Sequence, residues 1–111
     1  MMQIFDTLNN KKTDLKFSDK VRIYWCGVTV YDDAHIGHAR TIIVFDVLRR
    51  FLESQKITVE FIQNFTDVDD KIIDRAYREK ISPLELASKY TKNYFDDFDG
   101  LNVKRATSYP K

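Results

Sequence analysis

The chain has 111 residues, of which 43% are hydrophobic and 32% charged, with 18 lysines and arginines against 17 aspartates and glutamates. This composition excludes an intrinsically disordered chain, and a net charge of +1 excludes nucleic-acid binding that depends on bulk charge. The single cysteine excludes an internal disulfide. The sequence shows no charged-then-apolar leader and no run of 18 apolar residues, so we expect a cytoplasmic protein without membrane contact.

The first 26 residues predict three short strands. Apolar-rich runs at residues 4–8 and 15–17 flank a polar cluster at residues 9–14, which is typical of a small hairpin within residues 1–20. From residue 21 to residue 26 the side chains alternate, with Val21, Ile23 and Trp25 on one face. That period of two predicts a strand with Cys26 at its carboxyl end.

Residues 36–65 predict a helix followed by a second strand. In the first half of residues 36–55, apolar side chains occupy most of the helix circumference. This pattern is typical of a helix buried against a sheet. Residues 57–65 are rich in β-branched and aromatic side chains, and the connection is long enough for a right-handed crossover between parallel strands. The fold class is therefore α/β, the first half of a Rossmann-like parallel sheet with a small amino-terminal hairpin.

Two more helices complete the element order strand–helix–strand–helix–helix over residues 21–101, within one domain of residues 1–111. The spacing of Thr66 and Asp69 is that of a capping box, and predicts a helix start at Thr66 with acids in its first turn and Lys71 as their partner. Ser82 followed by Pro83 predicts the start of the last helix, whose aromatic stripe we interpret as packing surface. Gly100 is the expected stop, and the residues after it show no period.

The turn between the first parallel strand and the long helix carries most of the chemistry. Gly37 lies at the helix start, where unpaired N–H groups favour an anion such as a polyphosphate. His35 and His38 are three residues apart, so their rings project from one side of the first turn, and Arg40 adds a fixed charge. Alternatively the histidines cap the helix while Gly37 packs tightly, or Cys26 joins both histidines as ligands of one metal.

Residues 26–40 read Cys-Gly-Val-Thr-Val-Tyr-Asp-Asp-Ala-His-Ile-Gly-His-Ala-Arg. This stretch resembles the signature of the class I aminoacyl-tRNA synthetases, in particular the cysteinyl-tRNA synthetase family. The resemblance continues through residues 45–46, 64–73 and 95–102, and so covers nearly the whole chain. Val30 stands where related cysteine ligases that make small thiols tend to have proline, which favours the tRNA enzymes.

The resemblance implies that ATP, with Mg²⁺, activates cysteine to an adenylate and that the cysteinyl group then passes to tRNA(Cys). It implies a monomeric full enzyme with a zinc ion, of which Cys26 is one ligand, that binds the substrate thiolate. Zinc–thiolate binding separates cysteine from serine far better than pocket shape does. The other implied site residues are catalytic His35 and His38, ATP-binding His35, Ile36, Gly37, His38 and Arg40, and cysteine-binding Gly27, Thr29 and Thr66.

Several parts of the family pattern have no counterpart in this sequence: the other zinc ligands, the lysine-rich loop that closes on ATP, and the carboxyl-terminal tRNA-binding domain. We therefore interpret the chain as the amino-terminal portion of the catalytic domain, carrying the first half of the active site and inactive alone. Two alternatives remain at this stage. The chain could be a free-standing nucleotide-binding module, or one half of a split or related cysteine ligase.

Overall fold

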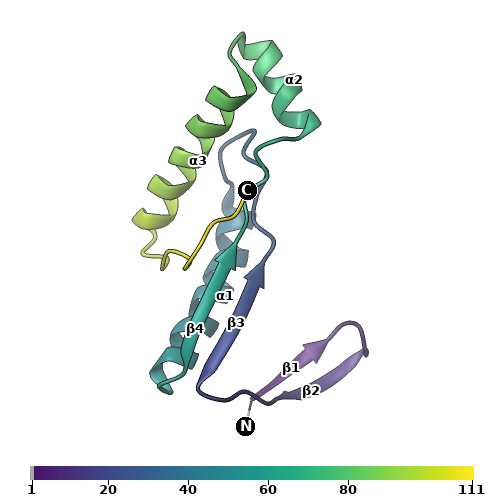
Figure 1. Ribbon diagram of the computed structural model, residues 1–111, viewed down its shortest axis with the longest axis vertical. Helices are drawn as coiled ribbons and strands as arrows, with labels where there is room; N and C mark the ends of the chain where they lie inside the picture. Colours follow the sequence, from purple (N-terminus) through teal and green to yellow (C-terminus); the bar gives the residue numbers. More distant parts are fainter. Residues whose placement is uncertain (1) are drawn as a thin grey trace.

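A parallel pair of strands joined by one long helix forms the centre of the structure (Figure 1). The computed structural model describes residues 2–111. A separate antiparallel hairpin precedes the pair, and a helical hairpin follows it. The elements are β1 (Met2–Asp6), β2 (Lys11–Leu15), β3 (Lys20–Trp25), α1 (Ile36–Ser54), β4 (Thr58–Gln63), α2 (Asp70–Glu79) and α3 (Pro83–Gly100).

The register of β3 on β4 follows from the alternation of apolar side chains. Lys20 lies opposite Thr58 and Trp25 opposite Gln63, so the two strands run in step from end to end. Trp25 is buried on one face of the pair, together with the alternate β4 residues Val59 and Phe61. The predicted α/β class, with a parallel pair and an amino-terminal hairpin, is confirmed, although the second hairpin strand begins at Lys11, earlier than predicted.

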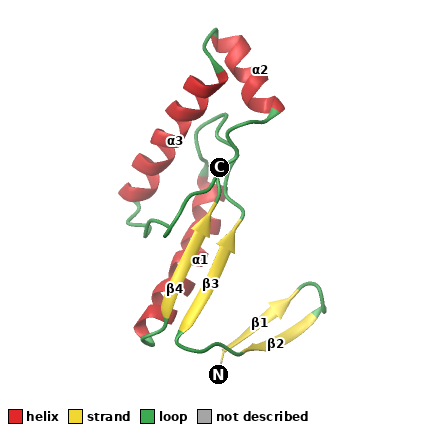
Figure 2. Cartoon of the chain, viewed as in Figure 1, coloured by secondary structure: helices red, strands yellow, loops and turns green. Residues whose placement is uncertain are grey.

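The segment after α3 shows no periodic pattern in its sequence. It lies along the side of β4 that faces away from β3 (Figure 2). Ser108 forms a parallel bridge with Ile62, and the Thr107 N–H donates to the Phe61 carbonyl at 2.7 Å. The buried Arg49 of α1 fixes the same segment by donating to the Arg105 carbonyl at 2.6 Å. As a result β4 is interior, and β3 is an edge strand of the parallel sheet.

The two later helices begin at side-chain caps, one of them at a different residue from the predicted one. Asp69, not Thr66, caps α2, because its carboxylate accepts the Lys71 N–H at 2.9 Å. Thr66 lies outside the helix and forms a parallel bridge with Thr29. The Ser82 hydroxyl accepts the Glu85 N–H at 3.1 Å, as predicted for α3.

The aromatic stripe of α3 is packing surface, as predicted. Tyr90, Tyr94 and Phe98 are buried, and the ring of Tyr94 meets Phe65 edge-on at 5.1 Å between centroids. Tyr109 from the last segment also stacks on Phe65, with 5.4 Å between ring centroids. These contacts attach α3 to the carboxyl end of β4, beside the turn that precedes α1.

The first half of α1 is more exposed than its sequence predicts. The buried residues of this helix are Ile42, Arg49 and Leu52. The prediction of a helix buried around most of its first half is therefore wrong within residues 2–111, because β3 and β4 cover only one side of it. None of the helices in this range combines the length and apolarity needed to cross a membrane. The large apolar residues that α1 exposes are Ile36, Ile43, Val44, Val47 and Phe51.

Candidate active site

A cavity of about 460 Å³ lies beyond the carboxyl end of β3, along the loop of residues 26–35 that leads into α1. Its volume is in the range of small-molecule sites, and the carboxyl ends of parallel strands are where α/β proteins bind ligands. Lys71 of α2 is the only lysine or arginine in the lining. The lining brings together five of the predicted site residues: Cys26, Gly27, Thr29, His35 and His38.

The two histidines form a reciprocal cap at the start of α1. His35 Nδ1 accepts the Gly37 N–H at 3.0 Å, and His38 Nδ1 accepts the His35 N–H at 3.1 Å. Their ring centroids are 3.9 Å apart. The capping interpretation is therefore correct for the Nδ1 atoms. The Nε2 atoms, which make no hydrogen bond within residues 2–111, are left for a ligand.

The environment of His38 favours its neutral form. The pKa of His38 is lowered, first because burial disfavours the charged ring and second because His35 lies beside it. A neutral ring that accepts a hydrogen bond at Nδ1 carries its proton on Nε2. His38 therefore presents Nε2 as a hydrogen-bond donor at neutral pH, which is the chemistry needed to bind an oxygen of a phosphate.

Two glycines allow the close packing around the cavity. A Cβ atom on Gly27 would lie 1.8 Å from the Asn64 backbone oxygen, and the Gly27 N–H donates to Asn64 Oδ1 at 2.8 Å. A Cβ atom on Gly37 would lie 2.8 Å from Cε1 of His35. Gly37 thus lets the His35 ring fold over the first turn of α1. Asn64, which follows β4 directly, is a supporting residue that our sequence analysis did not single out.

Polar contacts from α2 and α3 hold the loop at residues 32 and 33. Arg75 Nη1 lies 3.2 Å from Asp32 Oδ2, and Asn93 Nδ2 donates to Asp33 Oδ1 at 2.7 Å. Arg75 also donates to Glu79 at 2.5 Å, which raises the pKa of Arg75 and lowers that of Glu79. The sequence did not predict the contacts of Arg75 with Asp32 and of Asn93 with Asp33. The partners are 43 and 60 residues apart and share no local pattern.

Four predicted site residues do not line the cavity: Ile36, Gly37, Arg40 and Thr66. Ile36 is 88% exposed, and Arg40 is exposed on α1. Thr66 lies against the loop through its backbone, since its carbonyl accepts the Val30 N–H at 3.2 Å and its N–H donates to the Val28 carbonyl at 3.1 Å. The structure thus brings Thr66 next to the cavity-lining loop, whereas Ile36 and Arg40 lie on the exposed surface of α1.

Lys71 is placed differently from the sequence prediction. Its ammonium lies over the ring of Tyr31, 5.4 Å from the centroid, and it forms no ion pair with any carboxylate of residues 2–111. The expected partnership with the first-turn acids is therefore wrong. Lys71 instead places a positive charge at the lining of the cavity, where an anionic ligand would meet it.

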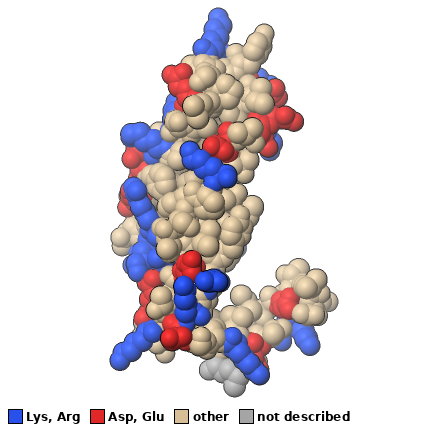
Figure 3. Space-filling model, viewed as in Figure 1, with Lys and Arg blue, Asp and Glu red and all other residues tan. Residues whose placement is uncertain are grey.

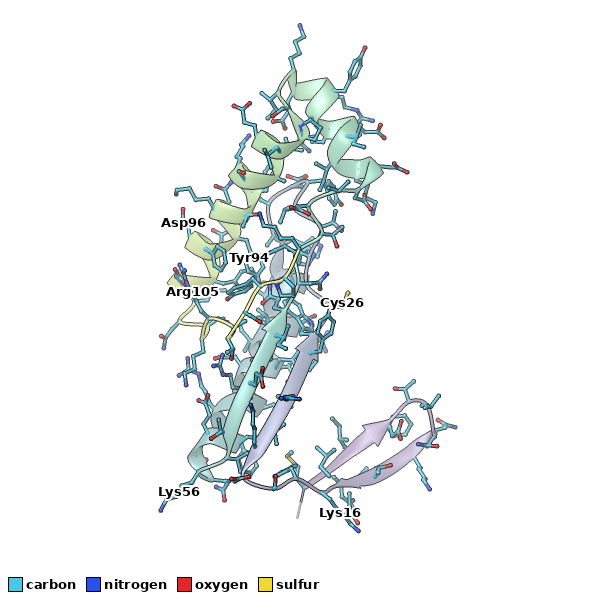
Figure 4. All side chains as sticks on the ribbon, in the orientation of Figure 1. Lys16, Cys26, Lys56, Tyr94, Asp96 and Arg105 are labelled. Atoms are coloured by element: carbon cyan, nitrogen blue, oxygen red, sulfur yellow. The ribbon has the colours of Figure 1, made fainter. Side chains whose placement is uncertain are left out.

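The thiol of Cys26 is exposed just beyond the tip of β3 (Figure 4). No three His, Cys, Asp or Glu side chains gather into a metal-binding group within residues 2–111. The interpretation of Cys26, His35 and His38 as ligands of one metal is therefore wrong. Cys26 alone fits a zinc ion as one soft ligand, because it is exposed, belongs to the lining of the cavity and is not held by a hydrogen bond within residues 2–111.

The chain is similar to known proteins over nearly its whole length. The family described as tRNA synthetases class I (C) catalytic domain matches residues 12–111. The cysteine–tRNA ligases of Clostridioides difficile and Thermodesulfovibrio yellowstonii are 52% and 51% identical over 99% of this chain, and that of Gloeothece citriformis is 45% identical. The chain spans about a quarter of the length of these curated relatives, 24% of the first and 23% of the others. The chain therefore belongs to the class I (C) family of tRNA synthetases and carries part of its catalytic domain.

Proposed function

We propose that this chain provides the nucleotide and amino-acid site of a cysteine–tRNA ligase. The proposed reaction activates cysteine with ATP and Mg²⁺ and transfers it to tRNA(Cys), in a monomeric enzyme of the cytoplasm. The observation that supports this best is that Cys26, His35 and His38 all line one cavity at the carboxyl end of a parallel strand. The match of residues 12–111 to the class I (C) tRNA synthetase catalytic domain supports the same proposal.

Activation in this proposal is an alignment reaction without a covalent enzyme intermediate. The cysteine carboxylate attacks the α-phosphorus of ATP, a new carboxylate–phosphorus bond forms, and pyrophosphate leaves with the electron pair of the broken bond. Negative charge builds on the phosphoryl oxygens, where the Nε2–H groups of His35 and His38 would donate hydrogen bonds. Lys71 and the amino terminus of α1 would stabilise the same negative charge on the phosphoryl oxygens.

Binding of the substrates would use the remaining predicted residues. Gly27, Thr29 and Thr66 would surround the cysteine. Zinc, when bound, supplies a soft Lewis acid for the substrate sulfur, and Cys26 would be one of its thiolate ligands. ATP would extend over the helix start. There, Ile36, Gly37 and Arg40 would contact it together with the histidines.

The proposal is tested with a chimera in which this chain replaces the matching 112 residues of the Clostridioides difficile ligase. Because the two sequences are 52% identical over that stretch, we expect a folded chimera with cysteine-dependent ATP–pyrophosphate exchange within about tenfold of the parent, a change of about 1.4 kcal/mol. Charging of tRNA(Cys) should be retained to a similar extent. A folded, monomeric chimera without exchange would overturn the proposal.

The isolated chain serves as the comparison. Half of a site should neither exchange pyrophosphate nor retain stoichiometric zinc, which isotope exchange and elemental analysis measure. One zinc per chain, or exchange above the blank, would contradict the view of the chain as half a site. Calorimetric binding of ATP by the isolated chain with micromolar affinity would favour the alternative of a free-standing nucleotide-binding module.

A further inference from the structure

The loop that leads into α1 is fixed by backbone hydrogen bonds at its beginning only. The Val30 N–H donates to the Thr66 carbonyl at 3.2 Å, and the Val28 carbonyl accepts the Thr66 N–H at 3.1 Å. By contrast, residues 31–34 make no backbone hydrogen bond to another element within residues 2–111. Because this second part of the loop runs directly into His35, the cap of α1, its position determines where the histidine pair lies.

Side chains of the helical hairpin formed by α2 and α3 hold the second part of the loop instead (Figure 1). Arg75 Nη1 of α2 donates to Asp32 Oδ2 at 3.2 Å, while Asp32 Oδ1 accepts the N–H of Asp33 at 2.8 Å. Asn93 of α3 in turn donates to Asp33 Oδ1 at 2.7 Å. Two consecutive loop residues are thus bound by side chains from two different helices.

Contacts within the helical hairpin orient the guanidinium of Arg75. Its Nε donates to Glu79 Oε1 at 2.5 Å, and its Nη2 donates to the Tyr90 hydroxyl at 3.1 Å. Tyr90 is buried and belongs to the lining of the cavity. With two nitrogens bound on the hairpin, Arg75 presents the third to Asp32 in a fixed direction. A lysine could not do the same, because a single ammonium does not reproduce the planar fork of a guanidinium.

We propose that Arg75 is a positioning residue for the activation of cysteine. By holding Asp32 it fixes the second part of the loop, and through the loop it aligns His35 and His38 with the phosphoryl group. Arg75 is not part of the cavity lining, so it acts through Asp32 and not on a substrate. This inference rests on the proposed function and extends it, because it assigns the alignment of the two histidines to a residue of α2.

The contact matters more for alignment than for stability. The side chains of Arg75 and Asp32 are 34% and 49% exposed, and an ion pair so accessible to water contributes little to stability. Alignment is more sensitive, since a displacement of about 1 Å can lower a rate by about 10²-fold. Cysteine binding should be spared, because Gly27 and Thr29 are fixed by their own contacts with residues 64 and 66.

The first test measures cysteine-dependent pyrophosphate exchange by the chimera with the Clostridioides difficile ligase after Arg75→Gln substitution. We expect kcat to fall by about 10–10²-fold while KM for cysteine stays within about threefold, since alignment is lost and substrate binding is not. Arg75→Lys should recover part of the loss, because it keeps the charge without the fork. A kcat within about threefold of the unchanged chimera, or a loss explained by KM for cysteine, would overturn the proposal.

Lys89→Gln is the matched control. Lys89 shares two partners with Arg75, because its ammonium lies 3.4 Å from Glu79 Oε2 and 4.9 Å from the ring centroid of Tyr90. Its ion pair lies within the helical hairpin and does not involve the loop. Figure 3 shows charged side chains of both signs over this hairpin, at the top of the view, so the control must remove one ion pair without releasing the loop. Lys89→Gln should leave kcat within about twofold, and an equal loss in both variants would contradict the role of Asp32.

The order of the loop tests the same contact without activity. In ¹⁵N relaxation measurements, a rigid backbone has order parameters of about 0.85 and a flexible one has values below about 0.6. In the isolated chain, we expect Arg75→Gln to lower the order parameters of residues 32–34 toward the flexible range. Val28 and Val30 should stay rigid, and Lys89→Gln should change neither group. Unchanged order at residues 32–34 in the Arg75→Gln chain would overturn the proposal.

The two measurements separate this inference from the proposed function. A chimera without any exchange would count against the proposed function, and the order of residues 32–34 would then decide whether Arg75 holds the loop. An active chimera whose kcat is insensitive to Arg75→Gln would leave the proposed function intact and overturn the positioning role.

Discussion

Replacing His38 with alanine in the chimera is expected to lower the rate constant of cysteine-dependent pyrophosphate exchange by about 10²–10³-fold, the usual cost of removing one hydrogen-bond donor to a developing charge. His38 lines the cavity, and its Nδ1 is already used to cap α1. The loss should therefore come from Nε2. Loss of the cap should reduce the free energy of unfolding by only about 1 kcal/mol, which urea denaturation measures.

Two further variants separate the cap from the chemistry. His38→Asn keeps an acceptor near the position of Nδ1, so it should restore stability and leave exchange impaired. His38→Gln places an amide N–H near the position of Nε2, so it should recover part of the exchange activity. If His38→Ala lowered stability as expected but left exchange within threefold of the unchanged chimera, His38 would be a structural cap only.

Replacing Gly27 with alanine is expected to destabilise the isolated chain by about 1–3 kcal/mol, the cost of forcing an extra methyl group into a packed site. The added Cβ would lie 1.8 Å from a backbone oxygen of Asn64, which cannot move away as a flexible side chain would. The cause is packing alone, because no glycine of residues 2–111 has a positive φ. Urea denaturation measures the change.

Gly100→Ala is the matched control for this substitution. A Cβ atom on Gly100 would have no heavy atom within 4 Å, and the residue is the last of α3. Its stability should stay the same or rise by up to about 1 kcal/mol, because alanine is the better helix former. A Gly27→Ala variant as stable as Gly100→Ala would mean that the loop does not pack on Asn64 as described.

The sequence was sufficient for features that depend on local patterns. Alternation at Val21, Ile23 and Trp25 is enough to predict β3, and Ser82 with Pro83 fixes the start of α3 because cap and first-turn chemistry are local. The loop signature likewise predicted that Cys26, His35 and His38 meet at one end of the sheet, since the residues lie between one strand and one helix. The three residues meet at one cavity because ligand sites of parallel sheets lie beyond the carboxyl ends of the strands.

Features that depend on distant partners could not be predicted. Thr66 and Asp69 both have cap chemistry, and pairing of Thr66 with Thr29, 37 positions earlier in the chain, leaves the cap to Asp69. The ion pair between Arg75 and Asp32 has no local sequence signal either. The exposure of α1 has the same origin, because an apolar pattern does not say which elements pack on each face of a helix.

The central claim is that the thiol of Cys26 and the two imidazoles face one shared cavity, and a nitroxide attached to the single cysteine tests it directly. In NMR spectra of the isolated, labelled chain, the ring protons of His35 and His38 should be broadened strongly by the spin label. Signals from the opposite end of the parallel pair, at Lys20 and Thr58, should be affected much less. Sharp histidine signals in a fully labelled and folded chain would contradict the shared cavity, and with it the proposed site.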